Sequence, residues 1–126
     1  MQNGLCILVV DDEPAVAQAL CYVLEQPGRK FVTAGTAEEG LRTLANGKFD
    51  IIITDHKMPG MSGLDLVRRL REQKFDGKIV VLSAHLSPEN IRSYTELAVN
   101  HMLPKPFDLT HLRSVIDSFS SGNNGA

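Results

Sequence analysis

The chain has 126 residues, with 13 basic and 15 acidic side chains and a formal net charge of −2 at pH 7. That length fits one domain, and a content of 43% hydrophobic and 22% charged residues is typical of a globular protein, which excludes a disordered chain. No apolar run approaches the roughly 18 residues of a membrane span, and no cluster of Lys and Arg predicts a surface for nucleic acid. The first residues lack the basic and apolar regions of a signal peptide, and we expect a cytoplasmic protein.

Cys6 and Cys21 lie in apolar stretches, which favours free thiols over a disulfide.

In chain order, five apolar segments are predicted to form β-strands: 5–10, 31–33, 51–53, 79–82 and 101–103. The first, third and fourth are continuous apolar runs, typical of strands that are buried on both faces of a sheet. The second and fifth are shorter and more polar, and we expect them to flank the others.

Between and after these strands, apolar side chains recur at helical spacing. The predicted inward faces are Val16, Leu20, Val23 and Leu24; Ala37, Leu41, Leu44 and Ala45; Leu66, Val67 and Leu70; Ile91, Tyr94, Leu97 and Ala98; and Leu112, Val115, Ile116 and Phe119. Three helix starts carry capping signals, namely Thr36 with Glu39, Ser87 before Pro88, and Asp108. The charged residues of the third helix (Arg68, Arg69, Arg71 and Glu72) are predicted to form a solvated face.

The alternation of strands and helices predicts an α/β chain of the (βα)₅ type. Strands separated by helices pair in parallel through right-handed crossovers, and the helices then cover both faces of the sheet. We expect residues 1–119 to form this three-layer, doubly wound domain. The polar segment 120–126 offers nothing to bury and is predicted to be a flexible tail or the start of a linker.

Polar side chains follow the predicted strands at the edge where ligands bind in open parallel sheets. Asp11 and Asp12 follow the first strand, Asp55 the third, Ser83 the fourth and Lys105 the fifth. Each residue alone is accounted for by a turn, a cap or a solvated loop. Together they predict a site, because crowded carboxylates repel one another and suit Mg²⁺, which binds carboxylates and phosphate oxygens. An Asp carboxylate can then attack a phosphoryl group, whose oxygens an ammonium and a hydroxyl would hold.

Four motifs surround these residues: VVDDEP at 9–14, TDHKMPGMSG at 54–63, VLSA at 81–84 and PKPF at 104–107. With these motifs in this order, the chain resembles the receiver domain of two-component response regulators over residues 5–119. The resemblance implies a flavodoxin-like fold with strand order 2-1-3-4-5. It also implies a tight turn at Gly60 and Gly63 and commonly a cis bond between Lys105 and Pro106.

The resemblance implies that Asp55 is the phosphoacceptor, with Ser83 and Lys105 binding the phosphoryl oxygens. The implied Mg²⁺ ligands are Asp12 directly, Asp11 often through water, Asp55, and the backbone carbonyl of Lys57. The implied partners are a sensor histidine kinase, or a phosphotransfer protein, and a downstream output protein or domain. The expected chain is thus a signalling phosphoacceptor and not an enzyme, with its oligomeric state open.

One position departs from the family pattern. Three residues before Lys105 the family usually has Tyr or Phe, whereas this chain has Met102, preceded by His101. We hypothesise in addition that Lys57 and His85, each two residues beyond a site residue, overhang the phosphoryl group and tune its lifetime. The alternative for both is a solvated loop position.

Three other functions are weighed against the switch. A haloacid-dehalogenase-like phosphatase usually has a second Asp two positions after the nucleophile, where this chain has Lys57. A receiver-like module that no longer uses phosphate is disfavoured by the intact acidic, hydroxyl and ammonium residues. FMN binding is disfavoured because the first strand leads into acids instead of a phosphate-binding loop. Whether an effector domain follows in a longer protein is open.

Overall fold

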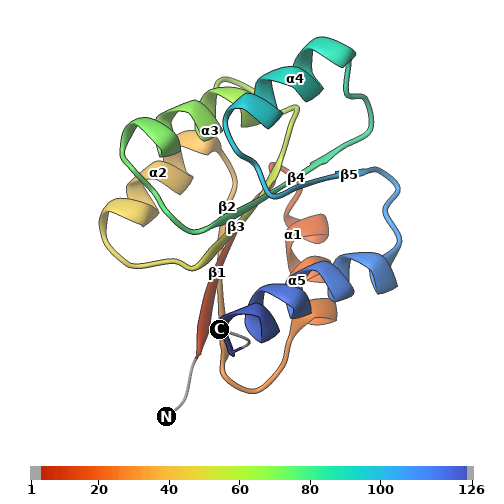
Figure 1. The fold of residues 1–126 in the computed structure, drawn as a ribbon. Coiled ribbons are helices and arrows are strands. Elements are labelled where there is room, and N and C mark those ends of the chain that lie inside the picture. The colour runs from red at the N-terminus through yellow and green to blue at the C-terminus, as the bar shows by residue number, and fades with distance from the viewer. Residues whose placement is uncertain (1–3, 125–126) are drawn as a thin grey trace.

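The computed structural model describes residues 4–124, with side chains described through residue 119. Within this range the chain alternates between strands and helices (Figure 1). The strands are β1 (Leu5–Val10), β2 (Arg29–Ala34), β3 (Ile51–Asp55), β4 (Lys78–Ser83) and β5 (His101–Pro104). The helices are α1 (Pro14–Leu24), α2 (Ala37–Ala45), α3 (Gly63–Glu72), α4 (Pro88–Glu96) and α5 (Leu109–Asn124). Every predicted strand and helix is present, and the strands extend one to three residues beyond most of the predicted apolar runs.

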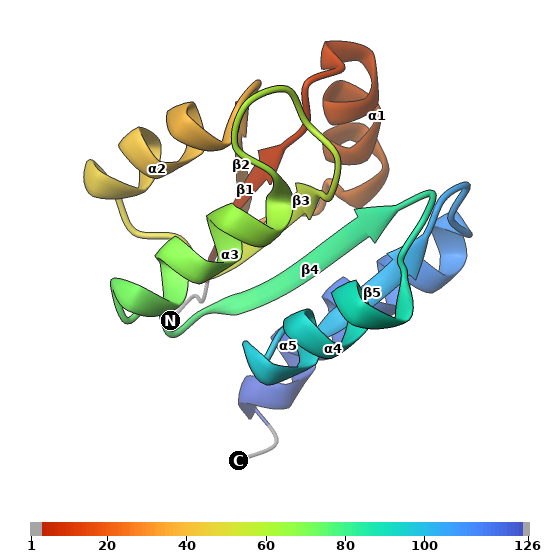
Figure 2. The ribbon, with the colours of Figure 1, turned by 90° about the horizontal axis from the view of Figure 1, so that it is seen from above.

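The strands form one parallel sheet in the order β2-β1-β3-β4-β5. Helices α1 and α5 lie on one face of this sheet, and α2, α3 and α4 lie on the other (Figures 1 and 2). The predicted three-layer α/β fold and its strand order are therefore confirmed. In such a sheet the carboxyl ends of all five strands point to the same edge, so the loops that follow them meet there.

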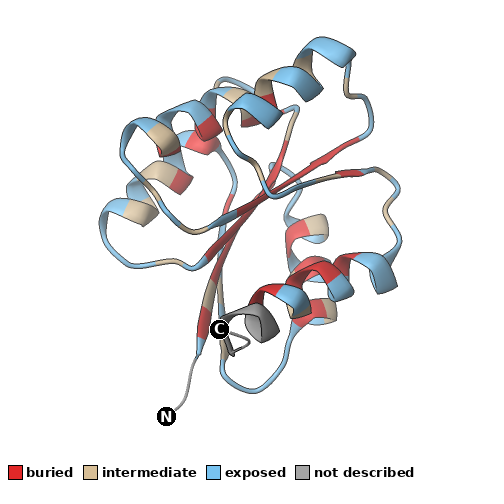
Figure 3. Ribbon diagram, in the orientation of Figure 1, coloured by how far each residue is buried: buried red, intermediate tan, exposed pale blue. Residues whose placement is uncertain are grey.

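The core is divided between the two faces of the sheet because side chains alternate along each strand. Ile7 and Val9 of β1 pack with α1 and α5, whereas Leu8 and Val10 pack with the helices of the opposite face. The central strands are buried almost throughout, whereas β2 and β5 are partly exposed (Figure 3). This confirms the division between central and flanking strands.

Side-chain caps start the helices at the predicted positions. The hydroxyls of Thr36 and Ser87 accept hydrogen bonds from backbone N–H groups of α2 and α4, and the carboxylate of Asp108 does so at α5. A fourth cap was not anticipated: Ser62 and Asp65 form a reciprocal capping box at the start of α3. This cap fixes where α3 begins, directly after the loop that follows Asp55.

Four sequence-based interpretations were wrong. Ala45 and Ala98, placed on inward helical faces, are exposed, because Ala45 is the last residue of α2 and Ala98 lies beyond the end of α4. Ile91, placed on the inward face of α4, is 42% exposed. The inward face of this helix is formed by Asn90, Tyr94 and Leu97, and Ile91 is rotated about 100° around the helix axis from Asn90. Arg71, placed on a solvated face, is half-buried. Its guanidinium donates to the backbone carbonyls of Leu97 (2.8 Å), Ala98 (2.9 Å) and Phe75 (2.7 Å). Arg71 thus ties α3 to the segment that follows α4.

At the carboxyl end of the chain, α5 continues through Asn124. The predicted polar segment 120–126 lies largely outside the description, since the side chains from residue 120 onward and residues 125–126 are not described. The boundary at residue 119 remains a prediction. Cys6 and Cys21 are free thiols, as expected. In the part of the chain that is described, no helix combines the length and the apolar character needed to cross a membrane.

Candidate functional site

Five of the residues singled out in the sequence lie at the carboxyl edge of the sheet. Asp11 and Asp12 follow β1, Asp55 ends β3, Ser83 ends β4 and Lys105 follows β5. The backbone between them is tied across the sheet, since the amide of Asp11 donates to the carbonyl of Ala34 and that of Lys105 to the carbonyl of Ser83. The parallel register therefore brings together residues that are far apart in sequence.

Three carboxylates form an acidic cluster at this edge. One oxygen each from Asp11, Asp12 and Asp55 lies within 4.8 Å of the others. Asp11 and Asp55 are 2% and 8% exposed, whereas Asp12 faces solvent. The cluster thus combines two buried carboxylates with one that is in contact with solvent.

The Asp11 carboxylate is incompletely satisfied. Its Oδ1 accepts a hydrogen bond of 2.9 Å from the amide of Glu13, but its buried Oδ2 has no hydrogen-bond partner. Burial raises the pKa of Asp11, and the charges of Asp55 and Asp12 add to that rise, whereas the Glu13 amide and Lys105 oppose it. A buried carboxylate oxygen in this position fits a cation bound to the cluster, because a cation would satisfy it and offset the mutual repulsion.

Lys105 supplies the positive charge of the site. Its Nζ lies 3.2 Å from Oδ1 of Asp55 and 3.7 Å from Oδ2 of Asp11. The amide of His56 donates to the same Asp55 oxygen at 2.9 Å. The Asp55 carboxylate is therefore held in one orientation by the backbone amide of His56 and by the Lys105 ammonium group. The bond between Lys105 and Pro106 is cis, as the family resemblance implied.

The Ser83 side chain is buried and is engaged with its own loop. Its hydroxyl donates to the carbonyl of His85 at 2.8 Å and accepts from the amide of the same residue at 3.1 Å. The hydroxyl proton would have to turn away from the His85 carbonyl in order to reach a ligand on Asp55. Any such turn would release one end of the loop that leads into α4.

Two glycines allow the loop after Asp55 to close on the site. Gly60 has a positive φ of 77°, which favours glycine. Gly63 has no space for a side chain, since a Cβ there would overlap the backbone carbonyl of Asp55 and lie 2.9 Å from Cα of His56. Its amide donates to the carbonyl of His56 at 2.8 Å. The first residue of α3 therefore packs directly on the backbone of the candidate acceptor.

The other positions considered in the sequence lie around this centre. The side chains of Lys57 and His85 are exposed, and their hypothesised influence on a phosphoryl group remains a prediction. Met102 is half-buried and packs with the core cluster of α2, α3 and α4, which also contains Tyr94. His101 is exposed, with its ring 5.9 Å from that of Phe119.

Sequence reasoning missed a polar contact next to the acceptor. The imidazole of His56 lies between two residues of α4, with Nδ1 2.5 Å from Oη of Tyr94 and Nε2 3.2 Å from Nδ2 of Asn90. Burial lowers the pKa of His56 and raises that of Tyr94. One signal was available, because a tyrosine on an inward helical face requires a hydrogen-bond partner for its hydroxyl. The spacing did not identify that partner.

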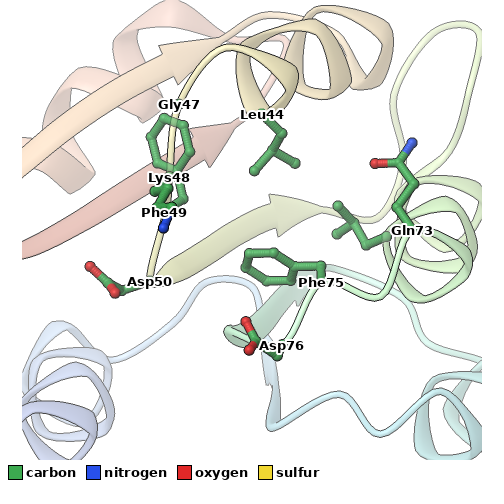
Figure 4. A pocket seen from close by; sticks show the side chains of 9 residues that line it. Leu44, Gly47, Lys48, Phe49, Asp50, Gln73, Phe75 and Asp76 are labelled. Carbon is green, nitrogen blue, oxygen red and sulfur yellow. The ribbon is translucent and has the colours of Figure 1, made fainter.

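Several cavities in the described part of the chain lie outside the acidic cluster. One of about 380 Å³ lies at the opposite edge of the sheet (Figure 4). Phe49, Asp50, Phe75 and Asp76, which precede β3 and β4, are among the residues that line it. A second, apolar hollow of about 420 Å³ is lined by α1 and by the segment that begins at Lys105. No predicted site residue lines the first cavity, so the chemistry is concentrated at the carboxyl edge.

Comparison with known families and proteins agrees with this geometry. The model of the response regulator receiver domain family matches residues 7–117. The chain is 38% identical over 121 residues to the DNA-binding transcriptional regulator NtrC of Azospirillum brasilense, covering 96% of this chain and 25% of that protein. It is 35% identical to the alkaline phosphatase synthesis transcriptional regulatory protein PhoP of Bacillus subtilis, covering 80% of this chain and 42% of that protein. The chain thus spans less than half the length of either relative.

Solved structures agree as well. A response regulator receiver protein from Pseudomonas putida is similar with a TM-score of 0.87 and 32% identity, covering 94% of this chain and 99% of that one. The response regulator TrrA of Thermotoga maritima, in complex with Mg²⁺ and BeF, is similar with a TM-score of 0.79 and 32% identity, covering 91% and 98%.

Proposed function

Because the chain belongs to the response regulator receiver domain family, we propose that Asp55 is its phosphoacceptor and that phosphorylation switches its contact with an output partner. The observation that carries this proposal is the position of the Asp55 carboxylate, 3.2 Å from the Lys105 ammonium and within the acidic cluster. A carboxylate beside the Lys105 ammonium, with two further acids that can hold a cation, is suited to attack a phosphoryl group, because the two positive charges would balance the negative phosphoryl oxygens.

In the proposed reaction, a carboxylate oxygen of Asp55 attacks the phosphorus atom of the donor. The new O–P bond forms as the bond between phosphorus and the donor breaks. For a phosphohistidine donor, an imidazole nitrogen leaves with the electron pair. The Lys105 ammonium would pair with one phosphoryl oxygen, and the Ser83 hydroxyl would donate to another once it turns away from His85.

The donor set at the site fits Mg²⁺. The side chains of Asp11, Asp12 and Asp55 and the backbone carbonyl of Lys57 would hold the ion, since Mg²⁺ prefers oxygen ligands and retains waters. The buried Oδ2 of Asp11, which lacks a hydrogen-bond partner, supports this assignment. When bound, the ion neutralises the charge on a phosphoryl oxygen during transfer.

We further propose that the domain acts as a signalling phosphoacceptor and not as an enzyme with a separate substrate. Lys57 occupies the position at which a haloacid-dehalogenase-like phosphatase would carry its second Asp. The phosphoryl group would come from a sensor histidine kinase or a phosphotransfer protein in the cytoplasm. The output would be a separate protein or a further domain, as the greater length of the relatives suggests.

Intact mass spectrometry tests the proposal. The purified chain is incubated with acetyl phosphate and Mg²⁺, and Asp55→Asn and Asp76→Asn are treated alongside. We expect one added phosphoryl group on the wild-type chain and on Asp76→Asn, and none on Asp55→Asn or without Mg²⁺. If the wild-type chain gains no mass and also fails to bind beryllofluoride, a stable phosphoryl mimic, the proposal is wrong. A receiver-like module that works without phosphate would then take its place.

A further inference from the structure

His56, the residue after Asp55, connects the candidate acceptor to helix α4. Its imidazole lies 2.5 Å from the hydroxyl of Tyr94 and 3.2 Å from the amide nitrogen of Asn90. The rings of His56 and Tyr94 meet edge to face, with centroids 5.5 Å apart and an interplanar angle of 74°. Asn90 and Tyr94 are four residues apart and so lie on the same face of α4. Both contact the side chain of His56, in the loop that follows β3.

The direction of these hydrogen bonds follows from the chemistry of the groups. The amide nitrogen of Asn90 can only donate, so Nε2 of His56 accepts. In the neutral imidazole, Nδ1 then carries the proton and donates it to Oη of Tyr94. The Tyr94 side chain is fully buried in an apolar cluster, where its hydroxyl needs a partner. His56 supplies that partner.

Hydrogen bonds therefore hold helix α4 at two places. His56 holds the side that faces the sheet, and Arg71 holds the carboxyl end through the carbonyls of Leu97 and Ala98. Only residues 84–87 separate Ser83 from the first residue of α4. A turn of the Ser83 hydroxyl away from His85 rearranges this short loop, and α4 can follow only if its bonds to His56 allow it.

We propose that His56 is a positioning residue that holds α4 in the arrangement in which Ser83 is bonded to His85. By this contact His56 opposes the arrangement that binds a phosphoryl group. The inference rests on the proposed function and adds to it the path from Asp55 to α4. Contacts that are made in one of two arrangements shift the equilibrium toward that arrangement by their own free energy. Their removal must then tighten binding of a phosphoryl mimic.

The test compares two tyrosine variants that lose the same atom. Tyr94→Phe removes the hydroxyl that His56 binds, and Tyr22→Phe removes one from a side chain that is 81% exposed on α1. Binding of beryllofluoride in the presence of Mg²⁺ is measured by titration. We expect Tyr94→Phe to bind the mimic about five-fold more tightly than the wild-type chain, the effect of one net hydrogen bond, and Tyr22→Phe to be unchanged. Without the mimic, amide hydrogens of α4 should exchange faster in Tyr94→Phe alone.

A second variant guards against a general effect of the core substitution. Asn90 is only half-buried, so Asn90→Ala should fold and should also tighten binding, by about two- to three-fold. A purely structural role for these contacts predicts weaker or unchanged binding, and either result in both variants overturns the proposal. If the wild-type chain itself fails to bind the mimic, the proposed function fails and this inference fails with it. If the wild-type chain binds the mimic, the proposed function stands, and the affinities of the two variants then test this inference alone.

Discussion

The α-carbon of Gly63 lies so close to the backbone carbonyl of Asp55 that any side chain on Gly63 would overlap it. This contact seats the first turn of α3 against the end of β3, and the Gly63 amide bonds to the carbonyl of His56. The orientation of the Asp55 carboxylate therefore depends on a residue eight positions further along the chain.

Gly63→Ala should destabilise the protein by about 2 kcal/mol, because the backbone must shift to admit the methyl group. We also expect slower phosphorylation by acetyl phosphate, since Asp55 would be displaced from Lys105. Urea unfolding and the rate of mass gain measure the two effects. Gly47→Ala is the matched control, because its Cβ would lie at an ordinary 3.6 Å from the Phe49 ring. Equal effects of the two substitutions would contradict the steric argument.

Ser83→Ala should weaken binding of beryllofluoride with Mg²⁺ by about tenfold, because one fluorine of the mimic, which stands in for a phosphoryl oxygen, loses its hydroxyl donor. The variant should also lose about 1 kcal/mol of stability, since the carbonyl and amide of His85 lose their partner. Ser83→Thr retains the hydroxyl and should retain binding. Equal affinity of the Ala variant and the wild-type chain would show that this hydroxyl has no part in holding the mimic.

Asp11→Asn should stabilise the protein by about 1 kcal/mol in the absence of divalent ions. The raised pKa of Asp11 reflects a buried carboxylate that is repelled by Asp55 and Asp12, and the amide removes that charge. Thermal unfolding with EDTA measures the gain, and Asp76→Asn, at an exposed position, is the control. Added Mg²⁺ should raise the melting temperature of the wild-type chain more than that of Asp11→Asn, because a bound ligand stabilises the folded state that binds it. The same response in both chains would remove Asp11 from the ion site.

Arg71→Met should destabilise the protein by about 2 kcal/mol, because three backbone carbonyls lose a charged donor while the aliphatic stem is retained. Arg69→Met, on the exposed face of the same helix, should change stability by less than about 0.5 kcal/mol. Denaturant unfolding of both variants measures the difference. A small effect of Arg71→Met would mean that water replaces the guanidinium at these carbonyls.

Much of the fold was predictable because its determinants are local. Continuous apolar runs identified the buried strands, such as β1, and helical spacing identified the helices between them. The end of each strand was then known to within a few residues. Since all the strands are parallel, those ends had to meet at one edge, and Asp11, Asp55, Ser83 and Lys105 do meet there. Their chemical roles remain predictions.

The missed or incorrect positions depend on how helices are rotated and where long side chains reach. Arg71 looked solvated because its helix neighbours are charged, but α4 ends within reach of its guanidinium. Ile91 looked buried because it lies three residues before Tyr94, but the face of α4 is centred on Asn90, Tyr94 and Leu97. Spacing along one helix does not indicate how that helix is turned against its neighbours.

The sequence by itself determined the order of the elements, the parallel sheet and the set of polar residues at its carboxyl edge. These follow from hydrophobic periodicity and chain connectivity, which act over short stretches. Only the tertiary structure decided that Oδ2 of Asp11 is buried without a hydrogen-bond partner and that His56 binds Tyr94, 38 residues away. Such features depend on how elements far apart in the sequence pack together, and that packing is a property of the whole core.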